Sequence, residues 1–468
     1  MQSSAQPLVN RAIEVWLTSA DQHWLLQRQA DMPALADTAA GGSVIHIDDN
    51  QLFQPIEGFG FSLTGGSALL IRRLPQDQRL ALLHELFSLD GDGIGVSVLR
   101  LTIGASDLSE RSFSYDDLPA GASDVSLAHF DLAAGDADVI PTVLEILAIN
   151  PTIRIIAAPW SAPVWMKTNS SFVGGELRPA CYPVYARYLA TYLKAMRAHG
   201  IVVHAITPQN EPLNHKNDPS MVMPAAAQAE FIGQHLGPVL HDAGLGDVAI
   251  LCWDHNCDVI DYSLTVLADV DAHRYVSGSA WHLYGGDIAA LSEVHRAYPD
   301  KKIYFTEQWV GSDGEFGGDL MWHVRHVLIG ALRNWSRIVL EWNLAADPGC
   351  CPHTPGGEAR CVGALTIDGG PVNGNQVSRN VAYYIIAHAA RWLRPGSVRI
   401  ASSDDALPNV ACMTADGSIV VIVLNDGDLA QIARIRHRHS EAVVHLPPRS
   451  VATCILAGSP GAERTLPA

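Results

Sequence analysis

The middle of the chain, about residues 55–390, alternates short apolar runs with helical patterns. Each run has the length of a strand and ends in polar, aromatic or glycine residues. Continuous apolar runs of this length are typical of parallel strands that are buried on both faces. The eight runs are Pro55–Ser62, Gly95–Thr102, Thr152–Pro159, Val202–Pro208, Val248–Asp254, Gly278–Leu283, Lys301–Gln308 and Arg337–Asn343.

Helical patterns lie between several of these runs, and together they predict a (β/α)₈ barrel, an α/β fold. The pattern leaves open one alternative, an open doubly wound α/β sheet. Gly58-Phe-Gly60 begins like a dinucleotide-binding glycine motif, but Leu63 stands where the third glycine belongs, which counts against that alternative. The predicted helices are Gln76–Phe87, Pro141–Ile149, Pro183–His199, Ala225–Ala243 and Leu320–Trp335.

The two ends of the chain show strand patterns instead. Ile13–Thr18 alternates apolar and polar residues, and a second short strand is predicted at Trp24–Gln29. Strands at both ends predict one discontinuous all-β domain, in which the N-terminal strands complete a sheet built mainly by the C-terminal part. The predicted C-terminal strands are Val398–Ser402, Val410–Thr414, Ser418–Asn425, Ile432–His437, Ala442–Leu446 and Val451–Leu456.

Composition narrows the class of protein. The chain has 468 residues, of which 48% are hydrophobic and 17% charged, so it is too apolar for a disordered chain. Its formal net charge of −18 makes nucleic acid and anionic membranes poor partners. No apolar run approaches a transmembrane span of about 18 residues, so no stable membrane insertion is predicted.

The first residues, Met1–Gln6, lack the basic and apolar regions of a signal peptide. We therefore expect a cytoplasmic protein, or a secreted or periplasmic one from which a signal peptide has been removed. The oligomeric state is left open.

The eight cysteines include no C-x-x-C pair, which argues against a zinc ribbon. Cys350, Cys351 and Cys361 share a loop with His353. A metal site there matches no standard zinc spacing. A loop disulfide to Cys361 and free buried thiols both remain open. We predict no metal and no cofactor.

Two glutamates end strands that lie on opposite sides of the predicted barrel mouth. Glu211 follows the fourth run, within Thr207-Pro-Gln-Asn-Glu-Pro212, and Glu307 ends the seventh. Catalytic groups of such barrels lie where the strands end. A pair of carboxylates is what glycosidic bond cleavage needs, because one protonates the leaving oxygen and the other attacks the sugar or activates water. For a single glutamate, a solvated loop charge is the simpler interpretation.

Other strand ends carry side chains that suit a sugar. Aromatic faces stack on sugar rings, and amide and imidazole groups orient hydroxyls. For each aromatic residue, plain core packing is the alternative. Metal binding by His255, His273 and His282 is disfavoured, because the sequence has no helical histidine pair. The strand-end residues are Arg100, Asp107, Trp160, Trp165, His282, Tyr284, Trp342 and Asn343.

The motifs that carry these residues resemble glycoside hydrolase family 30, and most closely its glucosylceramidase (glucocerebrosidase)-like branch. The resemblance runs over nearly the whole chain. The motifs are Gln54-Pro-Ile-Glu-Gly-Phe-Gly60, Leu99-Arg-Leu101, Ala158-Pro-Trp-Ser-Ala-Pro-Val-Trp-Met-Lys-Thr-Asn169, Thr207-Pro-Gln-Asn-Glu-Pro212, His282-Leu-Tyr284 and Phe305-Thr-Glu307.

The resemblance implies a (β/α)₈ TIM barrel with a side-fused β-sandwich formed from both chain ends. The implied ranges are residues 1–50 for the N-terminal sandwich strands, 51–393 for the barrel and 394–468 for the rest of the sandwich. It also implies a retaining mechanism, with Glu211 as the acid/base and Glu307 as the nucleophile. The implied substrate-binding residues are Arg100, Asp107, Trp160, Asn210, His282, Tyr284 and Trp342.

One loop departs from that branch. The glucosylceramidase branch has a Gly-Gly-Pro-Asn-rich loop after Trp342-Asn-Leu344, whereas this chain has Asp347–Gly357 with two cysteines. We expect a β-glucosidase or glucosylceramidase that acts on a β-linked carbohydrate or glycolipid. The alternatives within the family are an endo- or exo-β-1,6-glucanase or β-1,6-galactanase, and an enzyme that cleaves β-xylosides, β-fucosides or glucuronoxylan. A non-catalytic carbohydrate-binding barrel is the alternative from another class.

Overall fold

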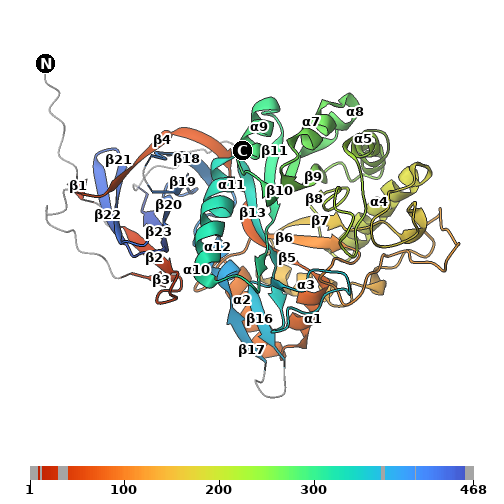
Figure 1. Cartoon of the computed structure of the whole chain (residues 1–468), viewed down its shortest axis with the longest axis horizontal. Helices are drawn as coiled ribbons and strands as arrows, with labels where there is room; N and C mark the ends of the chain where they lie inside the picture. The colour runs from red at the N-terminus through yellow and green to blue at the C-terminus, as the bar shows by residue number, and fades with distance from the viewer. Residues whose placement is uncertain (1–8, 11–12, 30–40, 370–374, 406, 459–468) are drawn as a thin grey trace.

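The computed structural model describes residues 9–10, 13–29, 41–369, 375–405 and 407–458. Residues 1–6, on which the signal-peptide expectation rests, lie outside this part of the chain. Figure 1 shows two parts side by side, a barrel surrounded by helices and a smaller part made of strands. The first is α/β and the second all-β, as the alternation of patterns predicts.

The barrel is closed by eight parallel strands, in the spatial order β10-β11-β13-β5-β6-β7-β8-β9. Closure removes the alternative of an open sheet. The inward-facing side chains, among them Val98, Leu251 and Leu340, are fully buried and fill the barrel. The strands are β5 (Gly58–Leu63), β6 (Val98–Ile103), β7 (Arg154–Pro159), β8 (Ala205–Ile206), β9 (Ala249–Cys257), β10 (Val276–Gly286), β11 (Lys302–Glu307) and β13 (Ser336–Asn343).

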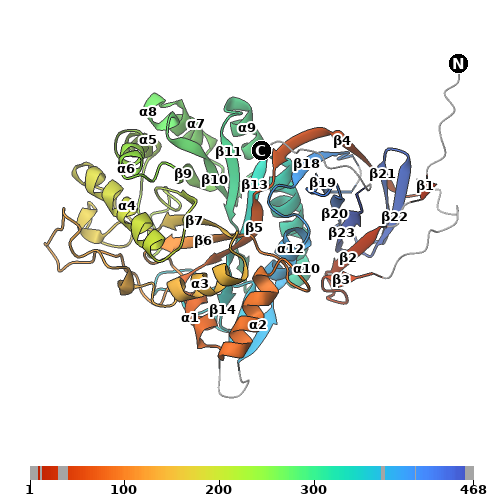
Figure 2. The ribbon, with the colours of Figure 1, turned by 180° about the vertical axis from the view of Figure 1, so that it is seen from behind.

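Helices surround the barrel and cover its outer face (Figure 2). Two long helical segments contain a π-helical turn, at Phe231–Leu236 and His323–Ile329, where the sequence pattern predicts unbroken helices. The α-helices are α1 (Gly65–Arg73), α2 (Gln76–Phe87), α3 (Val139–Ile149), α4 (Tyr182–Ala198), α5 (Ala225–Glu230), α6 (Gly237–Asp242), α7 (Ile260–Ala268), α8 (Val270–His273), α9 (Ala290–Ala297), α10 (Phe316–Trp322), α11 (Gly330–Arg333) and α12 (Val381–Ala390).

The second part is built from both ends of the chain. Its described strands form one hydrogen-bonded sheet of ten, in the order β1-β22-β21-β4-β18-β19-β20-β23-β2-β3. The N-terminal strands are β1 (Val9–Asn10), β2 (Glu14–Ser19), β3 (Gln27–Arg28) and β4 (Ser43–Pro55). The C-terminal strands are β18 (Val398–Ser402), β19 (Asn409–Met413), β20 (Ile419–Asn425), β21 (Gln431–His437), β22 (Ser440–Leu446) and β23 (Ser450–Leu456).

The pairing of the two ends confirms the predicted discontinuous domain. β2 pairs antiparallel with β23 over its whole length, from Glu14 opposite Ile455 to Ser19 opposite Ser450. β4 lies between β18 and β21 and then leads directly into the barrel. In Figures 1 and 2 the red N-terminal strands accordingly lie among the blue C-terminal ones. β3 is shorter than the predicted Trp24–Gln29 strand, because the chain bends at Leu25 and Leu26 before the strand begins.

We expect Leu17→Ala to lower the melting temperature, because Leu17 is 3% exposed and packs in the core of the β-sandwich. Loss of a buried leucine side chain costs about 2–5 kcal/mol of stability. Leu25→Ala is the matched control, since Leu25 lies on the same N-terminal segment but is 37% exposed. Thermal unfolding followed by circular dichroism measures both. Equal melting temperatures for the two variants would show that β2 contributes nothing to the core.

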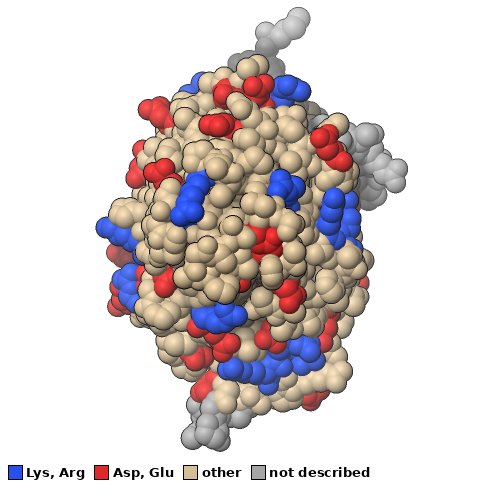
Figure 3. All heavy atoms as spheres, turned by 90° about the vertical axis from the view of Figure 1, so that its right-hand side faces the viewer, with Lys and Arg blue, Asp and Glu red and all other residues tan. Residues whose placement is uncertain are grey.

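Surface charge and cysteine state can be described for the part of the chain that the structure covers. Figure 3 shows acidic and basic groups interspersed on the side of the barrel remote from the sandwich, with several basic side chains gathered near the lower edge of the view. No helix in the described part of the chain is long and apolar enough to cross a bilayer. All eight cysteines are free thiols, so of the alternatives left open for the Cys350–Cys361 loop the structure has unbridged thiols.

Candidate active site

Glu211 and Glu307 meet at the mouth of the barrel, as their strand-end positions predict. Glu211 lies five residues beyond β8, and Glu307 is the last residue of β11. One side-chain oxygen of each and one ring nitrogen of His282 all lie within 4.8 Å of one another. Retaining glycosidases hold their carboxyl groups about 5–5.5 Å apart and inverting ones about 6.5–9.5 Å apart. The close approach of one oxygen from each carboxylate favours the retaining arrangement.

The backbone around Glu211 is held in an uncommon conformation. Its φ of 45° lies in the left-handed region, which non-glycine residues seldom adopt. The amide of Glu211 donates to the carbonyl of Asp254 at 2.9 Å, and the amide of Asn210 donates to that of Pro159 at 2.8 Å. These bonds to neighbouring strands fix the turn that aims the Glu211 side chain into the mouth. Strain of this kind concentrates at functional sites.

Glu307 is held by two donors from neighbouring strands. Arg100, on β6, donates from Nη1 to Oε2 of Glu307 at 2.5 Å. The hydroxyl of Tyr284, on β10, donates to Oε1 at 3.0 Å. The two bonds fix the plane of the carboxylate and the direction in which it faces.

Asp254 organises the charges beneath the pair, although no sequence motif predicts a role for it. Its side chain is fully buried and accepts four hydrogen bonds. Burial acts to raise the pKa of Asp254. The positive charge of Arg100 and the hydrogen-bond donors outweigh burial and hold this pKa far below its usual range. The donors are Arg100 Nη2 at 2.9 Å, Thr207 Oγ1 at 2.7 Å, Thr306 Oγ1 at 2.7 Å and His282 Nε2 at 3.1 Å.

His282 bridges Asp254 to the catalytic pair. Its Nε2 faces Oδ1 of Asp254 at 3.1 Å, and its Nδ1 faces Oε1 of Glu211 at 3.2 Å. Burial alone would lower the pKa of His282, but Glu307, Asp254 and Glu211 raise it to about 9. The ring therefore carries a proton on both nitrogens and has no lone pair for a metal ion. This donor chemistry makes the Glu211, His282 and Glu307 cluster a poor cation site.

In the site without substrate, the pKa values of the two glutamates are shifted in opposite directions. Burial raises the pKa of Glu307 above its ordinary value, against the pull of His282 and Arg100. Burial also acts to raise the pKa of Glu211, but the hydrogen bond from His282 and the nearby His255 and Asn214 hold it at about 2. Glu211 and Glu307 are close enough to share a single proton. The pH at which that proton is lost is therefore a property of the pair and not of either glutamate alone.

Arg100 also ties two tryptophans to the site. Its guanidinium carbon lies 4.9 Å from the ring centre of Trp160 and 5.4 Å from that of Trp342. The two indoles stack on each other, with ring centres 5.1 Å apart. Both are almost fully buried, so they form an aromatic floor more than an open platform. Trp165 is not part of this floor, since its indole N–H donates to the carbonyl of Asp116.

Asn210 and Asp107 complete the predicted set. Asn210 accepts from Arg100 Nη2 at 2.6 Å through its side-chain oxygen, which leaves its amide N–H₂ as a donor. Asp107 lines the groove beside the pair, and burial together with Glu307 raises the pKa of Asp107 to about 7. The loop Asp347–Gly357, which differs from the glucosylceramidase branch, is attached to Asp107, because the amide of Thr354 donates to the carbonyl of Asp107 at 2.7 Å.

A groove of about 430 Å³ contains the pair. Several lining residues were missed by the sequence analysis. Trp309 follows the seventh apolar run, so the strand-end rule could have found it. The same rule could have found Asp254, which ends the fifth run and lies beneath the pair, not in the groove lining. His255 and Asn256 lie at the end of β9, just beyond the predicted run Val248–Asp254. The remaining missed residues lie on irregular loops, where no periodicity points to them. The lining residues are Asp107, Glu211, Asn214, Lys216, Asn217, His255, Asn256, Tyr284, Glu307, Trp309, Trp342, Gly356, Gly357 and Glu358.

Comparison with known proteins matches the chain to two family models. The Glycosyl hydrolase family 30 TIM-barrel domain matches residues 56–391, and the Glycosyl hydrolase family 30 beta sandwich domain matches residues 396–454.

Relatives with a stated activity cover most of the chain. An endo-1,6-beta-D-glucanase of Neurospora crassa is 34% identical over 80% of this chain and 79% of its own length. A putative glucosylceramidase of Caenorhabditis elegans is 30% identical over 87% of this chain and 82% of its own length. The solved structure of an endo-beta1,6-glucanase superposes with a TM-score of 0.87 and 31% identity, and covers 96% of this chain and 100% of that one.

Proposed function

Because the chain belongs to glycoside hydrolase family 30, whose members are retaining β-glycosidases, we propose that it is an endo-β-1,6-glucanase. The chain is a glycoside hydrolase, and its substrate is a β-linked carbohydrate. The proposal concerns the sugar, the linkage and the position of the cut. It replaces our expectation of a glucosylceramide-type substrate as the first candidate.

The lining of the groove supports this choice. Among the described residues, no aliphatic side chain lines the groove around Glu211 and Glu307. The walls are carboxylate, amide, imidazole, ammonium, aromatic and glycine groups. A glucan chain offers hydroxyls to such groups on every residue, whereas the hydrocarbon of a glycolipid needs an apolar bed. The relatives at 31–34% identity are endo-1,6-β-glucanases, which points in the same direction.

We assign the two chemical steps to the two glutamates. Glu307 attacks the anomeric carbon and forms a bond to it while Glu211 gives its proton to the leaving oxygen. Glu211 then takes a proton from water, and the water oxygen displaces Glu307 from the sugar. The first step needs Glu307 ionised and aimed, which the hydrogen bonds from Arg100 and Tyr284 provide. The second needs Glu211 as a base.

The proton reaches Glu211 over a short path. In the free site the pKa directions favour a proton on Glu307, yet the first step uses it on Glu211. Nδ1 of His282 lies 3.2 Å from Oε1 of Glu211 and 3.7 Å from Oε1 of Glu307. Its position between both carboxylates lets the site redistribute one proton without a large movement.

A substrate panel tests the proposal. We expect purified protein to hydrolyse pustulan, a β-1,6-glucan, and to release oligosaccharides before glucose accumulates. Glucosylceramide in detergent micelles, β-1,6-galactan and aryl β-xyloside serve as comparison substrates, with rates given as kcat/KM. Faster cleavage of glucosylceramide than of pustulan would overturn the assignment of the substrate. Glucose as the sole early product from pustulan would contradict the endo mode.

The pH profile should move when His282 is replaced. His282 lowers the pKa of both glutamates, so His282→Gln raises both. The acidic limb of kcat/KM reports the nucleophile losing its proton and the basic limb reports the acid losing its proton. Both limbs should therefore shift to higher pH, by about one unit. His241→Gln, at an exposed site, is the control. A loss of activity at every pH with unmoved limbs would show that His282 acts only in binding.

A further inference from the structure

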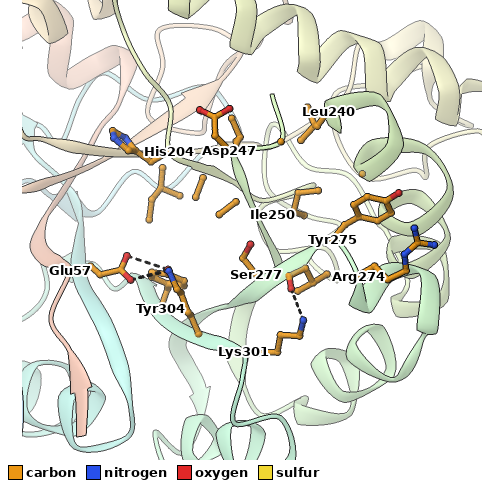
Figure 4. A pocket seen from close by; sticks show the side chains of 18 of the residues that line it. Glu57, His204, Leu240, Asp247, Ile250, Arg274, Tyr275, Ser277, Lys301 and Tyr304 are labelled. Carbon is orange, nitrogen blue, oxygen red and sulfur yellow. Dashed lines mark hydrogen bonds and ion pairs between the residues drawn. The ribbon is translucent and has the colours of Figure 1, made fainter. Parts of the chain in front are cut away.

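A second cavity, of about 660 Å³, lies at the opposite end of the barrel from the glutamates. It is bordered by the residues that begin barrel strands, including Arg154 of β7, Ala205 of β8 and Lys302 of β11. The catalytic residues lie where the strands end, so the barrel core separates this cavity from the groove. Figure 4 shows Glu57, His204, Asp247, Tyr275 and Lys301 arranged around the hollow.

One carboxylate in this cavity meets three cationic side chains. Glu57 lies 3.2 Å from Nη2 of Arg154, 3.4 Å from Nζ of Lys302 and 3.2 Å from Nη1 of Arg337. The hydroxyl of Tyr304 also approaches it, at 3.2 Å. Burial opposes ionisation of Glu57, but the three cations hold its pKa below the ordinary value. The cluster therefore carries three positive charges and one negative charge.

The surplus charge is not neutralised by the other acidic residues of the cavity. Asp247 pairs with Arg197 at 2.9 Å, and Asp300 pairs with Lys301 at 3.5 Å. Among the described residues, Arg154 and Lys302 form their ion pairs with Glu57 alone. Most N–H groups of these two side chains are thus uncommitted, and both side chains line the cavity. A local surplus of two positive charges stands out in a chain whose formal net charge is −18.

A further donor stands across the cavity. The Nδ1 atom of His204 accepts from the amide of Ile155 at 3.1 Å, so the neutral ring carries its proton on Nε2. Burial and Arg154 lower the pKa of His204, which keeps the ring neutral. Apolar walls from Ile156, Leu240 and Ile250 complete the hollow.

We propose that this cavity binds the phosphate group of inorganic phosphate or of a small phosphate monoester. Two surplus positive charges match the dianion, and arginine and lysine side chains are the usual phosphate ligands. Arg154 and Lys302 contact the phosphate oxygens, while Glu57 holds both cations in place. The volume exceeds what a free phosphate fills, and it lies in the usual range for a small-molecule site of about 300–1,000 Å³.

Isothermal titration calorimetry and thermal unfolding test the site at constant ionic strength, with chloride as the reference salt. Inorganic phosphate and glucose 6-phosphate are the two probes. We expect saturable binding of one phosphate group per chain and a melting temperature about 2–4 °C higher at saturation. Tighter binding of the monoester identifies an organic phosphate as the ligand, and equal or weaker binding identifies the free ion. The same heat and melting temperature in phosphate and chloride would overturn the proposal.

Two further measurements locate the binding. Arg154→Gln combined with Lys302→Gln should weaken binding at least tenfold, whereas Arg296→Gln, on the exposed face of α9, should leave it unchanged. In the unmodified protein, phosphate should protect Lys302 from acetylation by acetic anhydride while exposed Lys194 continues to react. Because the labelling uses the unmodified protein, its result does not depend on whether the double variant folds. Unchanged binding in the double variant, or equal labelling of Lys302 with and without phosphate, would show that the cavity is not the site.

Discussion

Glu307→Ala is expected to remove turnover of every β-glucoside, by roughly 10⁴-fold or more, because no covalent glycosyl intermediate can form without the nucleophile. The quality of the leaving group should make no difference. Glu315→Ala is the matched control, since Glu315 is exposed near the same strand and has no side-chain hydrogen bond as the cap of α10. It should retain full activity.

Glu211→Ala should give a different pattern. Substrates with poor leaving groups need protonation and should slow by about 10²–10⁴-fold. Dinitrophenyl glucosides depart without help, so their first step should remain close to that of the unmodified enzyme. The second step lacks a base, and the glycosyl-enzyme should accumulate as a burst of dinitrophenol.

Azide distinguishes the two roles by stereochemistry. In Glu211→Ala, azide attacks the glycosyl-enzyme and gives a β-glycosyl azide after a second inversion. In Glu307→Ala, azide occupies the cavity left by the side chain, attacks the substrate itself and gives an α-glycosyl azide. Proton NMR of the anomeric signals identifies both products. If the two anomers were exchanged between the variants, the roles of Glu211 and Glu307 would be reversed, although the pair itself would remain catalytic.

The barrel and the positions of the glutamates could be predicted because both depend on local pattern. Apolar runs such as Thr152–Pro159 become strands with nearly the same bounds, since a strand buried on both faces admits few polar residues. Val202–Pro208 is the weakest case, with only Ala205–Ile206 in the ladder. Its residues after Ile206 turn early, because the amides of Asn210 and Glu211 bond to neighbouring strands.

The charged network below the glutamates could not be predicted in the same way. Asp254 receives hydrogen bonds from residues of four different strands or strand ends, and no spacing along the chain reveals that convergence. The surplus charge around Glu57 has the same origin, because Arg154, Lys302 and Arg337 begin three separate strands or lie next to their start. Trp165 shows a limit of the strand-end rule. Its position after a strand does not decide whether the indole faces the sugar site or the core.

Arg100→Gln should be the most disruptive single change outside the glutamates. Arg100 is fully buried and is the shared donor of Glu307 and Asp254, so its loss leaves His282 as the one described cation beside two buried carboxylates. Removing one partner of a buried charged network costs about 3–5 kcal/mol of stability. The side chain is also packed against Trp160 and Trp342, which adds to the loss.

The pH dependence of that loss follows from the pKa values. Without Arg100, the pKa of Asp254 and of Glu307 must rise, because burial is then opposed only by His282 and the hydroxyl donors. A carboxyl whose folded pKa lies above its unfolded value contributes stability at low pH and loses it as the pH rises through the folded pKa. The gap in stability between Arg100→Gln and the unmodified protein should therefore widen from pH 4 to pH 7. The part due to Asp254 is already largely present at pH 4, because the pKa of Asp254 in the unmodified protein lies far below its usual range.

Thermal unfolding from pH 4 to 8 measures this gap, with Arg100→Lys as the conservative variant. Lysine restores the charge but cannot donate to Glu307, Asp254 and Asn210 at once, so it should recover stability at pH 7 more than it recovers kcat. Activity needs the fork geometry that aims Glu307, whereas stability needs mainly a cation beside the two carboxylates. A destabilisation of Arg100→Gln that is the same at pH 4 and pH 7 would show that Arg100 acts by packing under the tryptophans and not by balancing buried charge.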